Sequence, residues 1–440
     1  MLWEKGYCFT EDEEAADMIV INTCCFIHDA KMESIETILS LAEHKKSGRC
    51  KGLIVTGCLS ERYREELMKE IPEVDAIVGV NAIADIVLAI EDIIGHKNRH
   101  DYFGEDGEMN EPVLRGKRIV TTGGHYAYLK IAEGCDKHCT YCIIPRIRGD
   151  FRSVPLEKLL TESVNLVEGG VKELILVAQE TTLYGVDLYG RKMLPELLIK
   201  LCEIDGLKWI RLFYCYPEEI TDELIEVIRK EEKICNYLDM PIQHGADGIL
   251  KRMGRQTNRE KITALIKKLR HIIPDICLRT TLITGFPGET RTDHLDNLRL
   301  VKEMKFDRLG VFTYSAEEDT PAASMPGQIS ERTKKRRQDK LMETQQQIAF
   351  AIAEAMVGRH LTVMIEGQIT ELSTLGDEID LSSREFLDDE DGNVYVARTY
   401  RDAPGIDGYL FLKSERELLS GEFYDVVVTA SHDYDLLGEM

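Results

Sequence analysis

Three cysteines stand close together in the stretch EGCDKHCTYCIIPRIRG, where Cys135, Cys139 and Cys142 are separated by three and two residues. Thiolates are the usual ligands of iron–sulfur clusters. Three ligands on one short loop can hold three irons of a four-iron cluster and leave the fourth open to bind a substrate directly. A structural zinc site normally takes four protein ligands. The remaining candidate in the loop, His138, is expected to point outward, so the pattern favours a cluster over zinc.

Two further cysteines, Cys24 and Cys58, each follow a short apolar run, MIVINT or GLIVTG. Such runs are typical of buried parallel strands, and ligands collect at the carboxyl ends of these strands in doubly wound α/β sheets. We therefore expect a doubly wound α/β domain over residues 1–98. Its predicted strands are residues 18–23, 52–57 and 75–80, and a helix is predicted over residues 31–46.

A regular alternation of strands and helices follows a polar, glycine-rich stretch, residues 99–124, that we interpret as a linker. Repeated βα units imply a parallel sheet with right-handed crossovers. Six units predict a partial (β/α)6 barrel, with catalytic groups at the carboxyl ends of its strands. The predicted strands are residues 126–131, 173–177, 209–214, 237–241, 278–283 and 308–314, and the predicted helices are 156–167, 194–203, 222–232, 259–273 and 293–305.

The last part of the chain changes character. A long helix is predicted over residues 330–356, which completes a barrel domain over residues 125–357. Residues 358–440 then alternate apolar and polar residues in four short runs (LTVMIEG, YVARTY, YLFLK and YDVVVTA), which predicts a small β-barrel or sandwich.

Composition limits the class of protein. A chain of 440 residues is long enough for two to four domains, and 43% hydrophobic residues is ordinary for a globular protein. No apolar run approaches the length of a membrane span, and the start lacks the order of a secretory signal. We therefore expect a cytoplasmic protein, in which the 12 cysteines are not disulfide-bonded. Cys8, Cys50, Cys202, Cys215, Cys235 and Cys277 are interpreted as structural.

The net charge of −23 is concentrated near the carboxyl end, where residues 356–440 hold 19 Asp and Glu against 6 Lys and Arg. Proteins that bind nucleic acids usually present a basic face to the phosphates. An acidic domain instead suits a basic protein partner, although an acidic surface that only maintains solubility would look the same.

The cysteine loop resembles that of the radical S-adenosylmethionine superfamily, whose pattern C-x3-C-x2-C has an aromatic residue, here Tyr141, before the last cysteine. The resemblance implies that the open iron chelates S-adenosylmethionine, whose cleavage gives a 5′-deoxyadenosyl radical. It also implies that the residues ending the second barrel strand bind the methionyl amine. Those residues are Gln179, Glu180 and Thr181, with Glu180 the candidate acceptor; a solvated carboxylate is the alternative.

Two other strand ends belong to the same expected mouth. TTLITGFPGET ends in Gly285 and Gly288, which would allow close approach of the backbone to a nucleoside, although a plain turn explains the pair nearly as well. Gln243 and His244 end another strand, and His244 is more often a structural histidine than a catalytic one.

Over nearly its whole length the chain resembles the radical S-adenosylmethionine methylthiotransferases, with a TRAM-like barrel at the carboxyl end. INTCCFIHDAKMESIETIL and VTGCLSERY match the family's second and third amino-terminal cysteine loops through Cys24 and Cys58. The resemblance implies two four-iron–four-sulfur (4Fe-4S) clusters, the second being the auxiliary cluster at which sulfur is delivered.

The family's first cysteine has no counterpart in this sequence. Cys25 is a candidate replacement, but adjacent cysteines rarely both reach one cluster. We expect either that the native protein starts upstream or that the chain is a truncated enzyme with less than full activity.

RLFYCYPEEITDELIEVI, YLDMPIQH and FTYSAEEDTPAASM resemble the branch of the family that modifies an aspartate of ribosomal protein S-twelve. The resemblance implies transfer of a methylthio group to the aspartate β-carbon, with an external electron donor and sulfur source. The acidic carboxyl-terminal domain agrees, because it should repel RNA and attract a basic protein. The alternatives are the branch that modifies transfer RNA and a non-catalytic ribosome-binding remnant.

Overall fold

The computed structural model describes residues 1–96, 100–104, 118–369 and 393–440. The chain forms two compact units, and neither is a single stretch of sequence. The first unit comprises Met1–Arg118, Glu133–Arg152 and Ser315–Ser324, and the second comprises Ile119–Ala132, Ser153–Tyr314 and Met325–Met440. The cysteine loop that follows the first barrel strand therefore belongs to the same unit as Cys24 and Cys58.

The first unit contains a four-stranded parallel sheet in the order β1-β2-β3-β4. The bounds predicted for β1 (Met18–Thr23) and β2 (Gly52–Gly57) are confirmed, and β3 (Ala76–Val78) is shorter than predicted. The linker prediction is wrong for His100–Tyr102, which forms β4 beside β3, while residues 99 and 105–117 of the predicted linker lie outside the described residues. This polar strand has no apolar run that could reveal it; its pairing with β3 defines it.

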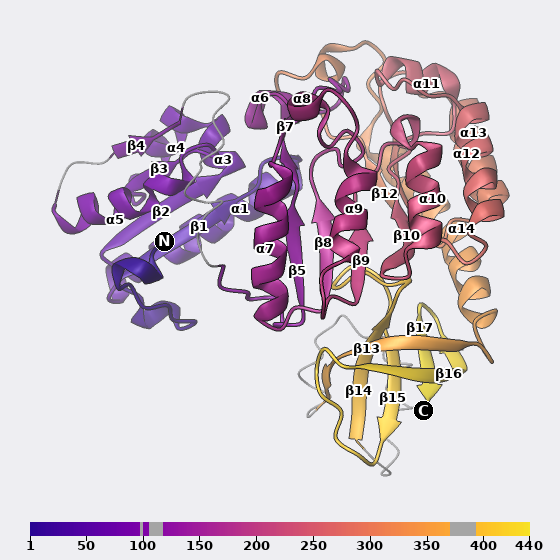
Figure 1. Cartoon of the computed structure of the whole chain (residues 1–440). Coiled ribbons are helices and arrows are strands. Elements are labelled where there is room, and N and C mark those ends of the chain that lie inside the picture. Colours follow the sequence, from indigo (N-terminus) through magenta and orange to yellow (C-terminus); the bar gives the residue numbers. More distant parts are fainter. Residues whose placement is uncertain (97–99, 105–117, 370–392) are drawn as a thin grey trace. The chain divides into compact units, whose positions relative to one another are not determined.

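Helices cover both faces of this sheet, as expected for an α/β fold (Figure 1). One face packs Leu53 and Val55 against Ile38 of α1 and Ile147 of α6, while Ile54 faces the opposite side and packs with Ile90 of α5. The helical elements are α1 (His28–Ala42), α2 (His44–Ser47), α3 (Cys58–Arg62), α4 (Arg64–Glu70), α5 (Ile86–Ile94) and α6 (Ile144–Arg148), with short 3-10 turns η1 (Trp3–Lys5), η2 (Glu13–Ala15) and η3 (Ile83–Asp85).

The second unit contains a six-stranded parallel sheet in the order β12-β11-β10-β9-β8-β5, with its helices on the outside (Figure 1). The six predicted strands are all present, as a partial barrel. They are β5 (Tyr126–Lys130), β8 (Glu173–Val177), β9 (Trp209–Leu212), β10 (Ile234–Asp239), β11 (Cys277–Thr284) and β12 (Arg308–Thr313). The helices are α7 (Leu156–Glu168), α8 (Val186–Tyr189), α9 (Leu194–Cys202), α10 (Asp222–Lys230), α11 (Asp247–Arg252), α12 (Arg259–Ile272), α13 (Arg291–Met304) and α14 (Glu331–Glu354), with η5 (Pro217–Glu219) and η6 (Pro321–Ser324) as 3-10 turns.

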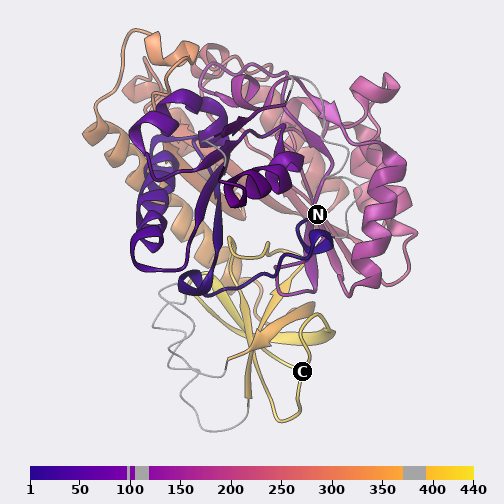
Figure 2. The same ribbon diagram turned by 90° about the vertical axis from the view of Figure 1, so that its left-hand side faces the viewer.

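The carboxyl-terminal strands form a closed five-stranded barrel (Figure 2). The four predicted strands are present, and a fifth, β17, completes the barrel between β15 and β16. The strands are β13 (His360–Gln368), β14 (Asn393–Thr399), β15 (Leu410–Ser414), β16 (Phe423–His432) and β17 (Asp435–Glu439). A barrel, rather than a sandwich, is therefore the correct form of this domain.

A buried ion cluster joins this barrel to the amino-terminal ends of the radical-barrel strands within the second unit. Glu173 of β8 accepts hydrogen bonds of 2.7 Å from Nε of Arg211 and from Nη2 of Arg398, and all three side chains are 0% exposed. Arg398, on β14, also pairs with Glu366 at 2.6 Å. These charges satisfy one another away from water, which fixes the small barrel to the sheet.

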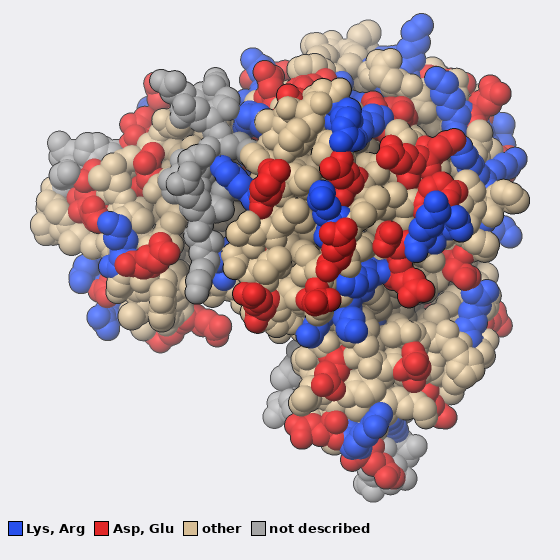
Figure 3. All heavy atoms as spheres, in the orientation of Figure 1, with Lys and Arg blue, Asp and Glu red and all other residues tan. Residues whose placement is uncertain are grey.

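The surface carries charges of both signs. Over the helices of the second unit, Figure 3 shows Lys and Arg side chains interspersed with Asp and Glu. Among the helices that the structure describes, none is long and apolar enough to cross a membrane. Of the six cysteines interpreted as structural, Cys50, Cys215, Cys235 and Cys277 are buried and Cys202 is half-buried, but Cys8 is exposed, so it does not pack in a core.

Candidate functional site

The cysteine loop is closed at its base and built from short turns. β6 (Ala132–Glu133) and β7 (Arg152–Ser153) form a two-stranded sheet at the two ends of the loop. Inside it, the amide of Cys135 donates to the carbonyl of Gly149 at 3.2 Å, and the amide of Cys142 donates to the carbonyl of Cys139 at 2.9 Å. These bonds hold the three cysteines on one compact loop.

The three thiols of this loop lie within electrostatic reach of one another. Cys135 and Cys139 are buried and Cys142 is half-buried, whereas His138 is exposed, as expected. Burial raises the pKa of the Cys142 thiol to about 12, and the neighbouring thiols of Cys139 and Cys135 add smaller contributions. Among the described residues no three His, Cys, Asp or Glu side chains are already arranged around a metal position. The chemistry of the donor set, three thiols on one loop, fits an iron–sulfur cluster.

A second group of thiols lies in the first unit at the carboxyl ends of β1 and β2. Cys24 is exposed, and its amide and carbonyl both bond to the hydroxyl of Ser34. Cys58 begins α3 and is buried. Cys25 is fully buried, and its Sγ donates to the carbonyl of Cys58 at 3.1 Å. Burial raises the pKa of Cys25 to about 12, and Cys58 adds to this shift.

At the carboxyl end of β8, the three residues predicted to bind S-adenosylmethionine have different environments. The Oε1 atom of Gln179 is a buried acceptor with no hydrogen-bond partner among the described residues. Glu180 is fully buried and accepts from the amide of Thr182 at 2.8 Å, so it is not a solvated carboxylate. Thr181 donates its hydroxyl to the carbonyl of Phe213 at 2.7 Å and so ties β8 to the end of β9.

The strand end after β10 resembles that of β8. Gln243 has a left-handed φ of 77° and, like Gln179, a buried Oε1 with no partner among the described residues. His244 is fully buried, and its Nδ1 accepts from the amide of Ala246 at 2.9 Å. Burial lowers the pKa of His244 to about 3, and its Nε2 is buried without a hydrogen-bond partner among the described residues, so its structural role stays a prediction. Because buried polar atoms rarely stay unpaired, the two glutamine oxygens fit a polar ligand such as S-adenosylmethionine.

Gly285 and Gly288 both have φ values in the left-handed region, 76° and 78°. The amide of Gly285 donates to the Glu289 carboxylate, and the amide of Gly288 donates to the carbonyl of Gly327 at 2.7 Å. A Cβ on Gly285 would stand 2.3 Å from the Lys334 side chain. The turn itself therefore requires glycine, and nucleoside binding at this loop stays a prediction.

Comparison with known families and proteins agrees with this division of the chain. Residues 129–317 match the Radical SAM superfamily, residues 1–79 match the Uncharacterized protein family UPF0004, and residues 383–440 match the TRAM domain. The ribosomal protein uS12 methylthiotransferase RimO of Lachnoclostridium phytofermentans is 58% identical over 438 residues, covering 100% of this chain and 94% of that protein. The chain belongs to the RimO family.

A second RimO, from Thermoanaerobacter, is 48% identical over 439 residues and covers 100% of this chain and 94% of its own length. Among solved structures, the radical S-adenosylmethionine methyltransferase TsrM from Kitasatospora setae is similar with a TM-score of 0.48 and 13% identity, over 78% of this chain and 68% of that one. The radical SAM match implies a four-iron–four-sulfur cluster and S-adenosylmethionine in this RimO-family chain.

Two arginines beside the thiols were not predicted from the sequence. Arg62 of α3 donates to the carbonyl of Cys25 at 3.2 Å and forms a buried ion pair of 3.0 Å with Glu317. Glu317 belongs to the strap, which we define as Ser315–Ser324, the last segment of the first unit. Arg148 of α6 donates to Sγ of Cys58 at 3.1 Å. The pairs are far apart in the sequence, so no local pattern could have revealed them.

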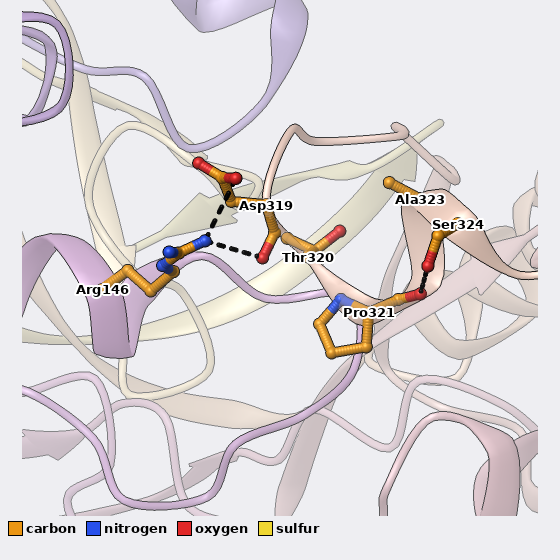
Figure 4. Close-up of a pocket in the computed structure, with 6 residues that line it drawn as sticks. All are labelled: Arg146, Asp319, Thr320, Pro321, Ala323 and Ser324. Atoms are coloured by element: carbon orange, nitrogen blue, oxygen red, sulfur yellow. Dashed lines mark hydrogen bonds and ion pairs between the residues drawn. The ribbon is translucent and has the colours of Figure 1, made fainter.

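The strap also forms a shallow hollow of about 550 Å³ with α6 (Figure 4). Arg146 and Asp319 face each other across it with an ion pair of 3.2 Å, and both side chains are more than 60% exposed. The amide of Ala322 donates to the carbonyl of Thr140, inside the cysteine loop, at 2.9 Å. The strap therefore supports the loop, and exposed charges line the hollow beside it.

Cys24 and Cys25 are expected to differ in iron binding. The thiol of Cys24 is exposed and lies within electrostatic reach of Cys58, whereas the thiol of Cys25 is buried and donates to a carbonyl. After anaerobic reconstitution, we expect Cys24→Ala to lower the iron content by about four per chain, the content of one cluster. Cys25→Ala should keep this iron. The measurement is iron and acid-labile sulfide per chain, and loss of iron only in Cys25→Ala would reverse the assignment.

Proposed function

We propose that this chain transfers a methylthio group to the β-carbon of an aspartate in ribosomal protein uS12, by radical S-adenosylmethionine chemistry. The observation that carries the proposal is the 58% identity to a RimO over 100% of the chain. It is supported by the cysteine loop and by the group formed by Cys24 and Cys58, which lie in the same compact unit.

In this proposal Cys135, Cys139 and Cys142 bind the radical cluster, and Cys24 and Cys58 bind the auxiliary cluster together with a further, non-protein ligand. The clusters and S-adenosylmethionine, when bound, supply abstraction of hydrogen from an unactivated carbon and delivery of methylated sulfur. The protein holds the clusters with its thiolates. Tyr141 lies beside the last ligand, as it does in the superfamily's pattern.

The barrel mouth has the complementary task of holding S-adenosylmethionine. The buried Oε1 atoms of Gln179 and Gln243, which have no partner within the described part of the chain, are available to its amino and hydroxyl donors. Glu180 supplies a buried carboxylate that would attract the ammonium group. Thr181, Gly285 and Gly288 shape the strand ends through backbone contacts. The burial of Glu180, Thr181 and Gly285 would help to exclude water from the reacting atoms.

Charge supports a protein substrate over transfer RNA. The chain carries a net charge of −23, which suits a basic ribosomal protein and opposes phosphate backbones. We place the reaction in the cytoplasm, where the substrate is made, and infer an external electron donor and sulfur source.

Mass spectrometry distinguishes the candidate substrates. The reconstituted protein is incubated with S-adenosylmethionine, dithionite, sulfide and either ribosomal protein uS12 or transfer RNA. We expect one methylthio group on a single aspartate of uS12, no modified RNA, and formation of 5′-deoxyadenosine. A modification found only on RNA would contradict the proposal. Binding of uS12 without any 5′-deoxyadenosine would instead favour the non-catalytic alternative.

A further inference from the structure

One guanidinium bridges the two groups of candidate cluster ligands. Arg148 donates from Nη2 to Sγ of Cys58 at 3.1 Å and from Nη1 to Oε2 of Glu133 at 3.3 Å. Glu133 stands two residues before Cys135, at the base of the cysteine loop, and Arg148 follows the same loop on α6. All of these residues belong to the first unit.

The surroundings make this charge effective. The side chain of Glu133 is 9% exposed and that of Arg148 is 23% exposed, and Cys58 is buried. Arginine stays charged at all working pH values and has only hydrogen-bond donors. Little water therefore screens the charge of Arg148 from the Cys58 sulfur. The carboxylate of Glu133 offsets part of that charge.

We propose that Arg148 is a positioning residue that raises the reduction potential of the cluster bound through Cys58, and that Glu133 limits this effect. The inference rests on the proposed function, because it requires Cys58 to bind the auxiliary cluster. One-electron reduction adds negative charge to a cluster and its thiolates. A cation donating to a ligand sulfur stabilises that reduced state, and hydrogen bonds to sulfur are a recognised control of cluster potentials.

A purely structural role makes a different prediction. If Arg148 only held α6 against α3, then removing either partner of the ion pair would loosen the site, and the potential would change in one direction or stay constant. The electrostatic role requires that the two substitutions shift the reduction potential in opposite directions. Removing Arg148 makes reduction harder, whereas neutralising Glu133 leaves the positive charge unopposed and makes reduction easier.

The experiment uses the full chain with Cys135, Cys139 and Cys142 replaced by alanine, so that only the Cys58 cluster contributes. After anaerobic reconstitution, the protein is titrated with dithionite and the reduced cluster is followed by electron paramagnetic resonance. We expect Arg148→Met to shift the one-electron equilibrium about tenfold toward the oxidised state, about 59 mV lower in potential. Glu133→Gln should shift it the opposite way. Arg148→Lys should keep part of the effect, because it retains the charge but not the fork.

The matched control is Arg146→Gln, on the same helix, whose side chain is 62% exposed and pairs with an exposed aspartate. It should leave the potential unchanged. If Arg148→Met binds no cluster, the inference is tested by the directions in which Arg148→Lys and Glu133→Gln shift the reduction potential. The inference would be overturned if the variants had equal reduction potentials or if both substitutions shifted the potential in the same direction. It would also be overturned if the protein without the three loop cysteines bound no cluster. Methylthiolation of uS12 by the unmodified chain is measured separately, so failure of the inference is distinguishable from failure of the proposed function.

Discussion

Replacement of Cys139 by alanine is expected to abolish methylthiolation of uS12 and cleavage of S-adenosylmethionine together. Cys139 is buried in the middle of the loop, and its carbonyl accepts the bond from the Cys142 amide. An alanine at this position keeps the turn but removes one of three thiolates. Two thiolates with no further ligand cannot hold three irons of a cubane, so the reconstituted variant should lack about four irons per chain.

The measurement combines iron and sulfide content with the yield of 5′-deoxyadenosine. Cys202→Ala is the matched control, because Cys202 is a half-buried cysteine at the end of α9, away from both ligand groups in the sequence. It should retain iron and activity. Full iron content and 5′-deoxyadenosine formation in Cys139→Ala would show that the loop does not bind the radical cluster.

β2 was predictable because its burial on both faces gives a continuous apolar run. β1 lies at the edge of the sheet and alternates buried and exposed residues, but its run of apolar residues still marked it as a strand. MIVINT and GLIVTG end at residues that cannot extend such a run, and the predicted bounds of β1 and β2 agree with the structure. β10 begins at Ile234, three residues before its predicted start, and the polar Asn236 separates these first residues from the apolar run that follows. β4 and β17 are short strands that depend on pairing with neighbours, which a local pattern does not report.

The candidate site likewise contains residues that a local pattern predicts and contacts that only the folded chain brings together. The spacing of Cys135, Cys139 and Cys142 is local, so the sequence alone identifies the loop and its chemistry. The contact of Arg148 with Cys58 joins residues 90 positions apart, and the pair of Arg62 with Glu317 joins residues 255 apart. Such contacts follow from the packing of the first unit. They are therefore visible only once β1, β2, α3 and the strap are in place.

Replacement of Glu173 by glutamine is expected to lower the free energy of unfolding more than the other substitutions proposed above. Its carboxylate accepts hydrogen bonds from Arg211 and Arg398, and none of the three side chains is exposed. The neutral variant leaves the buried guanidinium of Arg211 without a counter-charge and Arg398 with Glu366 alone. Breaking a buried ion pair costs about 3–5 kcal/mol, so the midpoint of thermal unfolding should fall by roughly 10 °C.

An exposed pair supplies the control for this prediction. Glu226 and Arg229 lie 2.9 Å apart on α10, and each side chain is 44% exposed. Pairs of this kind contribute little because water and salt screen them. Glu226→Gln should leave the unfolding midpoint unchanged in circular dichroism or calorimetry. A midpoint for Glu173→Gln equal to that of the control would mean that the buried cluster does not stabilise the second unit.

The stabilisation by Glu173 should also depend on pH in a defined direction. Burial by itself would raise the pKa of Glu173, but the charges of Arg398 and Arg211 outweigh it, so the folded-state pKa is lowered. The contribution is therefore complete above the unfolded value of about 4.3 and is lost as the pH falls through the folded value. Below about pH 4 the unmodified protein should approach the Glu173→Gln variant in unfolding midpoint. A difference that stays constant from pH 7 down to the acid transition would assign the stabilisation to hydrogen bonding and shape instead of charge.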